Sequence, residues 1–179
     1  MMKSAIAVLA MVTLMAAGSV SEAAVKLFSA DINTEQATPE PVIDTPLPAF
    51  GAGVFKLDES TNEFSWDILV VDFLLQAGET ASMIHGPAAA GINAGVLITL
   101  GIGQTKIGSA NLADVATATG FTVEQLVEQV TTDQWYVNVH TSKNPSGEIR
   151  GQIKFFPEPT ALGLCGLAGV GVLARRRRR

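Results

Sequence analysis

The stretches Trp135–Thr141 (WYVNVHT) and Glu148–Phe156 (EIRGQIKFF) alternate apolar and polar side chains with a period of two, which predicts two strands, over 134–141 and 148–156. A turn of the type Asn-Pro-Ser-Gly lies between them, so the two strands are expected to form a hairpin. The apolar residues of both strands lie on the same face of the hairpin only if the residue numbers of each cross-strand pair sum to an even number, for example Val139 with Gly151 and Val137 with Ile153.

That register predicts a polar stripe on the opposite face, with His140 opposite Arg150, Asn138 opposite Gln152 and Tyr136 opposite Lys154. Two interpretations of the stripe stay open. It is either a patch that contacts a ligand or a cross-strand polar network that fixes the register of the hairpin. The candidate ligand patch consists of Tyr136, Asn138, His140, Glu148, Arg150 and Gln152.

The rest of the chain between Ala24 and Phe156 continues in short runs of period two. Phe55 and Leu57 share one strand face, and after a polar turn Phe64, Trp66, Ile68 and Val70 share another, which predicts a second hairpin. Further strands are expected at 25–32, 80–85 and 95–102. Apolar residues at helical spacing, with Thr122 and Gln125 in capping-box positions, predict one short helix over 122–131. The fold class is therefore all-β, an antiparallel Greek-key sandwich or barrel with one short helix.

Composition limits the kinds of partner. The roughly 130 residues of this part suit one domain. They contain 6 basic and 15 acidic residues, a net charge of about −9, so nucleic acid is not expected as a partner. The only cysteine, Cys165, lies beyond the domain, which excludes internal disulfides and a cysteine nucleophile.

The C-terminal residues 157–179 have the features of a membrane-targeting signal. Pro157, Glu158 and Pro159 precede an apolar run to Ala174, and Arg175, Arg176, Arg177, Arg178 and Arg179 end the chain. The 15 residues from Thr160 to Ala174 are expected to form a short transmembrane helix, below the roughly 20 that a stable span needs, with the arginines on the cytoplasmic side.

This arrangement closely resembles the PEP-CTERM sorting signal of bacteria. The resemblance implies that an exosortase-type membrane protease recognises Pro157, Glu158 and Pro159, removes the tail, and releases or attaches the protein outside. Two alternatives stay open, an ordinary C-terminal anchor and an arginine tail that binds nucleic acid.

The N-terminal residues 1–23 fit a signal peptide. Lys3 precedes an apolar stretch over 5–17, and Ser21 and Ala23 occupy the −3 and −1 places of a cleavage site before Ala24. The predicted organisation is thus a signal helix at 1–23, a β domain at 24–156 and a sorting tail at 157–179.

A second resemblance covers most of 25–156. The stretches 135–141 and 145–153 look like the C-terminal signature of the CHRD domain, named for chordin, and Met83–Ala88 with Gly91–Gly95 is similar to its central His-Ile-His-Gly region. Met83 stands where that motif has its first histidine, and Glu40-Pro41-Val42 represents the usual Glu-Val-Pro-Pro loop only loosely. The resemblance implies an immunoglobulin-like or superoxide-dismutase-like β fold and a secreted, non-catalytic role.

Catalysis is the competing hypothesis. His85 and His140 are the only histidines, and a catalytic transition-metal site usually needs three or more protein ligands, so a carboxylate such as Glu148 would have to join them. Common hydrolase, zinc-protease and nucleotide-loop motifs are missing from the sequence.

We therefore predict an exported, non-catalytic binding or structural protein at the bacterial cell surface or in the extracellular matrix, without a cofactor. Its expected partners are the exosortase-type protease, the inner membrane in passing, and an extracellular polysaccharide or protein. The alternative is a metal-dependent extracellular enzyme that uses His85 and His140.

Overall fold

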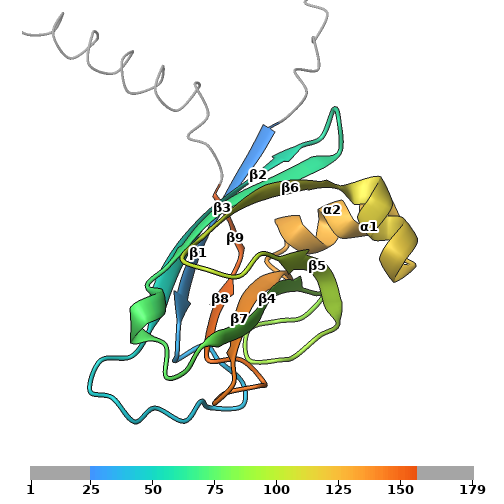
Figure 1. The fold of residues 1–179 in the computed structure, drawn as a ribbon. Coiled ribbons are helices and arrows are strands. Elements are labelled where there is room, and N and C mark those ends of the chain that lie inside the picture. The colour runs from blue at the N-terminus through green and yellow to red at the C-terminus, as the bar shows by residue number, and fades with distance from the viewer. Residues whose placement is uncertain (1–24, 157–179) are drawn as a thin grey trace, which may run out of the picture.

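A computed structural model describes residues 25–156, and nine strands in this range form one antiparallel sheet (Figure 1). The signal peptide and the sorting tail predicted from the sequence, with Pro157, Glu158, Pro159 and Arg175 to Arg179, lie outside the described residues. The strands are β1 (Val25–Asn33), β2 (Phe50–Asp58), β3 (Glu63–Val70), β4 (Glu79–His85), β5 (Val96–Leu100), β6 (Thr105–Asn111), β7 (Tyr136–Thr141), β8 (Ile149–Gln152) and β9 (Lys154–Phe156).

The sheet has the order β5-β4-β7-β8-β1-β2-β3-β6, and β9 adds to β1. It curls into a nearly closed barrel, so that the edge strands β5 and β6 approach one another and helix α1 (Leu112–Thr119) packs against both (Figure 1). The all-β antiparallel prediction is confirmed. No helix between residues 25 and 156 has the length and apolar character needed to cross a membrane.

A buried ion pair joins β4 to β6 across the gap between the edge strands. Lys106 Nζ lies 3.0 Å from Glu79 Oε1, and the two side chains are 0% and 4% exposed. The same carboxylate accepts from the backbone N–H of Gly103 at 2.8 Å and from the Ser82 hydroxyl, while Lys106 also donates to the Gly103 carbonyl. This cluster holds one end of the barrel together, where no backbone ladder joins β5 and β6 among the described residues.

The barrel interior is filled by the alternating apolar residues predicted from the sequence. Phe64, Ile68 and Val70 are fully buried, and the Trp135 ring meets Phe64 edge-on with 5.1 Å between ring centres. Trp66, which we expected on the same face, is only partly buried. Among the described residues, the core extends from Phe28 to Phe155, so the sheet has a core of its own and we expect residues 24–156 to fold as a unit.

Residues 25–156 contain two short α-helices, whereas the sequence pattern predicted one in this part of the chain. The expected helix is α2 (Val123–Thr131), and its capping box between Thr122 and Gln125 is formed in both directions. Helix α1 was not predicted, because only two of its residues, Leu112 and Val115, are buried, so its sequence shows almost no helical period of apolar residues. It is instead held by its ends, where the Asn111 side chain caps the N-terminus and Gly120 ends the helix in the left-handed conformation. A single 3₁₀ turn, η1 (Asp72–Leu74), follows β3.

Strand β6 was also missed, because its pattern is inverted. The Lys106 side chain points inward to the carboxylate of Glu79, while Ile107 is 73% exposed. The polar and apolar positions are therefore exchanged relative to an ordinary strand. The predicted strand at 148–156 is divided at Ile153, whose N–H donates to the Trp135 carbonyl before β9 moves on to pair with β1.

The predicted register of the β7–β8 hairpin is wrong by two residues, although its parity is right. Val137 pairs with Gly151 and Asn138 with Arg150, so His140 is not opposite Arg150. The cause lies in the connecting loop, where the N–H of Glu148 donates to the Val139 carbonyl and Val139 therefore pairs with Ile149.

Candidate functional site

Six polar side chains gather on the outer face of β4, β7 and β8. The register places His85 beside Tyr136 and Tyr136 beside Gln152 in one row. The next row holds Met83, Asn138 and Arg150, and the third pairs Ala81 with His140. Five of the six residues of the predicted patch lie on this face, and His85 joins them from β4. The six residues are His85, Tyr136, Asn138, His140, Arg150 and Gln152.

Arg150 lies at the centre of this polar cluster and is only 1% exposed. Its guanidinium donates to Asn93 Oδ1 at 3.3 Å, to the Ala89 carbonyl at 3.3 Å and to Gln152 Oε1 at 3.2 Å. It also stands 3.5 Å above the centre of the Tyr136 ring, a cation–π contact. Burial lowers the pKa of Arg150 from its ordinary value. No carboxylate within residues 25–156 forms an ion pair with it.

The connection between β4 and β5, residues 86–95, covers the cluster. The N–H of Ala94 donates to the Tyr136 hydroxyl at 2.9 Å, and Gln152 Nε2 donates to the Ala88 carbonyl at 2.9 Å. The cluster is consequently buried beneath this loop rather than open to a large ligand, with Tyr136 1% and Asn138 5% exposed. His140, at the margin of the loop, is partly exposed.

The two histidines lie close together in the cluster. Their ring centres are 5.9 Å apart, with an angle of 49° between the ring planes, and the His85 ring also stacks on Tyr136 at 5.1 Å. Each Nδ1 contacts a backbone carbonyl, that of Ala94 at 3.0 Å for His85 and that of Pro145 at 2.9 Å for His140. Burial is the main cause that lowers the pKa of His85, and the charges of His140 and Arg150 act in the same direction against the hydrogen bond to Ala94. His85 is therefore held neutral at physiological pH.

Glu148, the sixth residue of the predicted patch, lies elsewhere. Its carboxylate is fully buried and accepts hydrogen bonds from the backbone N–H of Gln76 at 2.7 Å, from the Thr141 hydroxyl at 2.7 Å and from Asn144 Nδ2 at 3.0 Å. These contacts order the β7–β8 loop. In the part of the chain that the structure describes, no three His, Cys, Asp or Glu side chains come together around a possible metal position.

Comparison with protein families identifies this architecture. The sequence profile of the CHRD domain matches residues 28–153, from β1 to the residue after β8. The chain belongs to the CHRD family. No curated protein and no solved structure shows significant similarity to it.

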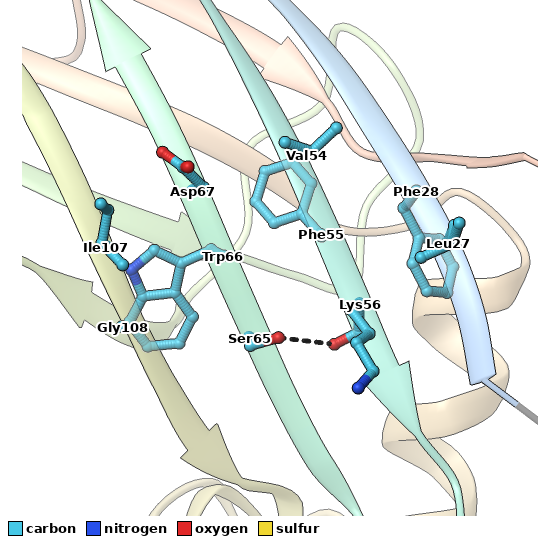
Figure 2. Close-up of a pocket in the computed structure, with 10 residues that line it drawn as sticks. All are labelled: Leu27, Phe28, Val54, Phe55, Lys56, Ser65, Trp66, Asp67, Ile107 and Gly108. Carbon is cyan, nitrogen blue, oxygen red and sulfur yellow. Dashed lines mark hydrogen bonds between the residues drawn. The ribbon is translucent and has the colours of Figure 1, made fainter.

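A second candidate site of this CHRD domain is a groove on the outer face of β1, β2, β3 and β6, with a volume of about 380 Å³ (Figure 2). A row of paired residues, Phe28, Phe55, Trp66 and Gly108, lies beneath it, and the side chains of Phe28 and Phe55 are directed into the barrel core rather than into the groove. Gly108 leaves room for the Trp66 ring, since a Cβ there would lie 2.8 Å from it.

The walls of the groove combine exposed apolar and polar side chains. Val54 and Ile107 are 61% and 73% exposed, and Lys56, Ser65 and Asp67 stand beside them (Figure 2). This groove was not predicted from the sequence. The available signal was an apolar residue at a solvent-facing position in each of two strands, Val54 in β2 and Ile107 in β6, which a search for buried periodicity passes over.

Proposed function

We propose that this CHRD protein is exported, sorted to the bacterial cell surface or extracellular matrix by its PEP-CTERM-type tail, and acts there as a non-catalytic binding or structural module. One observation carries the proposal: the described residues form a nine-stranded barrel with its own hydrophobic core, and the Pro157-Glu158-Pro159 motif follows directly in the sequence.

The position of the core supports this division of the chain. Within residues 25–156, the core extends from Phe28 to Phe155, so the described barrel has a hydrophobic core of its own. The inner membrane is then a temporary partner, because a 15-residue apolar run before five arginines holds the chain only until it is cut. An acidic domain without cysteines suits an extracellular setting in which the core alone supplies stability.

The groove on β1, β2, β3 and β6 is the surface that suits an extracellular ligand best. Its exposed apolar walls give contact area, and Lys56, Ser65 and Asp67 offer hydrogen bonds to hydroxyl or amide groups. An extended polymer, either a polysaccharide or a protein segment, fits such a surface better than a small substrate does.

Mass spectrometry of the mature protein tests the sorting. In a bacterium that contains an exosortase, we expect the secreted or surface-attached protein to lack both the leader, residues 1–23, and the five terminal arginines. Replacing Pro157, Glu158 and Pro159 by alanine should leave the uncut chain in the inner membrane, whereas Lys154→Ala, three residues before the motif, should be processed normally. A mature wild-type protein that still carries Arg175 to Arg179 would show that the tail is an ordinary anchor.

Binding is tested separately with residues 24–156 and isolated extracellular matrix of the producing bacterium. Val54→Lys and Ile107→Lys should each weaken retention at least about tenfold, because each places a charge in the apolar wall. Thr99→Lys, on the exposed side of β5, is the matched control and should bind like the wild type. Equal retention of all four proteins would remove the groove as the binding surface.

A further inference from the structure

Three buried side-chain atoms of residues 25–156 lack a hydrogen-bond partner, and all three belong to the polar cluster. They are His85 Nε2, His140 Nε2 and Asn138 Oδ1. An unpartnered buried polar atom costs about 1–3 kcal/mol. All three atoms lie on one face of two neighbouring strands, which indicates that they share a ligand there.

The hydrogen bonds at Nδ1 decide what the free nitrogens can do. A backbone carbonyl can only accept, so Nδ1 of each ring carries the proton in the contacts to Ala94 and Pro145. A neutral imidazole protonated at Nδ1 presents a lone pair at Nε2. A second partner at Nδ1 that fixes this tautomer is also the usual outer support of a histidine that binds a metal ion.

The distance between the rings fits one ion bound between them. With metal–nitrogen bonds of about 2.0–2.1 Å, two imidazole centres lie about 5 Å apart in a tetrahedral site and about 6.4 Å apart in a linear one. The observed separation is 5.9 Å. Since Ala81, and not His85, is the partner of His140, the two rings lean toward one another across the intervening row, which contains Met83 and Asn138.

The surroundings select the kind of metal. The guanidinium of Arg150 belongs to the same cluster, and no carboxylate among residues 25–156 accompanies the two histidines, so a doubly charged ion would be repelled more strongly than a singly charged one. Met83 contributes a thioether in the row between the rings, and thioethers favour copper(I). His140 is partly exposed as a residue, while its Nε2 atom is buried.

We propose that His85 and His140 bind one copper(I) ion through their Nε2 atoms, with Met83 as the soft donor between them. The site goes beyond the proposed function and depends neither on sorting nor on the groove. It needs no catalytic step, because the ion would complete the hydrogen-bonded cluster that holds residues 86–95 over the sheet.

Anaerobic competition between residues 24–156 and the copper(I) chelator bicinchoninate tests the proposal. This range excludes Cys165, which would itself bind copper(I). We expect one copper(I) per chain. His85→Ala and His140→Ala should each lower the affinity by more than about 100-fold, beyond the 10–100-fold that loss of an outer partner costs a metal site. Met83→Leu should lower it by about 10-fold, the lower end of that range.

Silver(I), an air-stable ion of the same charge, gives a readout that does not depend on affinity. On titration with silver nitrate, the ¹⁵N resonances of both Nε2 atoms should shift while both Nδ1 atoms stay protonated. Met83→His should turn the preference toward zinc(II), because it supplies a third imidazole. Lys143→Ala, on the β7–β8 loop outside the cluster, should bind copper(I) like the wild type.

Two results would overturn the inference. One is a wild-type affinity for copper(I) no higher than that of the double variant His85→Ala/His140→Ala. The other is tighter binding of zinc(II) than of copper(I) by the wild type. If His85→Ala does not fold, the partly exposed His140 and Met83 still carry the test, since an unchanged affinity in both His140→Ala and Met83→Leu contradicts the site equally.

Discussion

Replacing Lys106 by methionine should destabilise the barrel strongly, although lysine and methionine have side chains of similar length. Lys106 and Glu79 are 0% and 4% exposed at the side chain, so the substitution leaves a carboxylate buried without its counter-charge. Breaking a buried pair on one side typically costs about 3–5 kcal/mol. Glu79 keeps the donors from Gly103 and Ser82, so we expect the lower end, about 3 kcal/mol.

The assay is thermal and urea unfolding of residues 24–156. With an unfolding entropy of about 2.1 cal/mol/K per residue over some 130 residues, a loss of about 3 kcal/mol lowers Tm by about 11 °C. The double variant Lys106→Met/Glu79→Gln removes both charges and keeps an acceptor for Gly103, so it should lie within about 1 kcal/mol of the wild type.

The exposed pair between Lys143 and Asp44 supplies the control. The side chains there are 27% and 68% exposed, and Lys143→Met should change stability by less than about 0.5 kcal/mol. Two results would show that the pair does not offset the cost of burying a charge: a Lys106→Met variant whose Tm lies within about 1 °C of the wild type, or a double variant as unstable as the single one.

Three further predictions concern other parts of the domain. Gly147 has φ of +121°, and a Cβ there would collide with the side-chain amide of Asn138, so Gly147→Ala should lower the free energy of unfolding in urea by more than about 3 kcal/mol. Gly120→Ala, at φ of +81° in open space, should lower it by only about 1 kcal/mol. Equal losses in the two variants would contradict the role of Asn138. Thr122→Ala removes the capping box of α2 and should lower stability by about 1 kcal/mol, measured the same way, with no loss arguing that tertiary contacts alone hold the helix. The pKa of His85 is lowered below 6.5 in the folded protein, so the unfolded chain binds more protons as the pH falls through about 6.5, and the free energy of unfolding should drop there. His85→Gln should make the free energy of unfolding depend less on pH in this range. An unchanged pH dependence would show that the pKa of His85 is not lowered by folding.

The sequence predicted those elements in which local period and buried face agree. Strands β1 to β4 and helix α2 each bury one regular side, and α2 also has a capping box. Helix α1 and strand β6 have no such agreement. Asn111 and Gly120 define α1 from outside, and β6 is recognisable only once Lys106 is known to meet Glu79 across the barrel, a contact between residues 27 positions apart.

The site was predicted in composition but not in arrangement. Parity alone placed Tyr136, Asn138, His140, Arg150 and Gln152 on one face. The register is set in the β7–β8 loop, where the N–H of Glu148 donates to the Val139 carbonyl and the Glu148 carboxylate accepts from the N–H of Gln76, a residue 72 positions away. A loop whose geometry is set by a distant strand connection cannot be read from the turn residues themselves.

The two interpretations of the polar stripe apply to different atoms of the same side chains. A network whose only role is to fix register has every reason to satisfy all its members, since a partly satisfied buried network is worse than an apolar surface. Arg150, Gln152 and the Tyr136 hydroxyl follow that rule, because each has a partner in the loop 86–95 or on β8. The Nε2 atoms of His85 and His140 depart from it. Replacing both histidines by phenylalanine would remove two unsatisfied acceptors, but also the Nδ1–H donors to the carbonyls of Ala94 and Pro145. In a purely structural cluster, the difference in stability between the wild type and this double variant should therefore be the same with and without copper(I). If instead copper(I) stabilises the wild type and not the double variant, the unsatisfied nitrogens are the part of the stripe that binds a ligand, and the other residues support them.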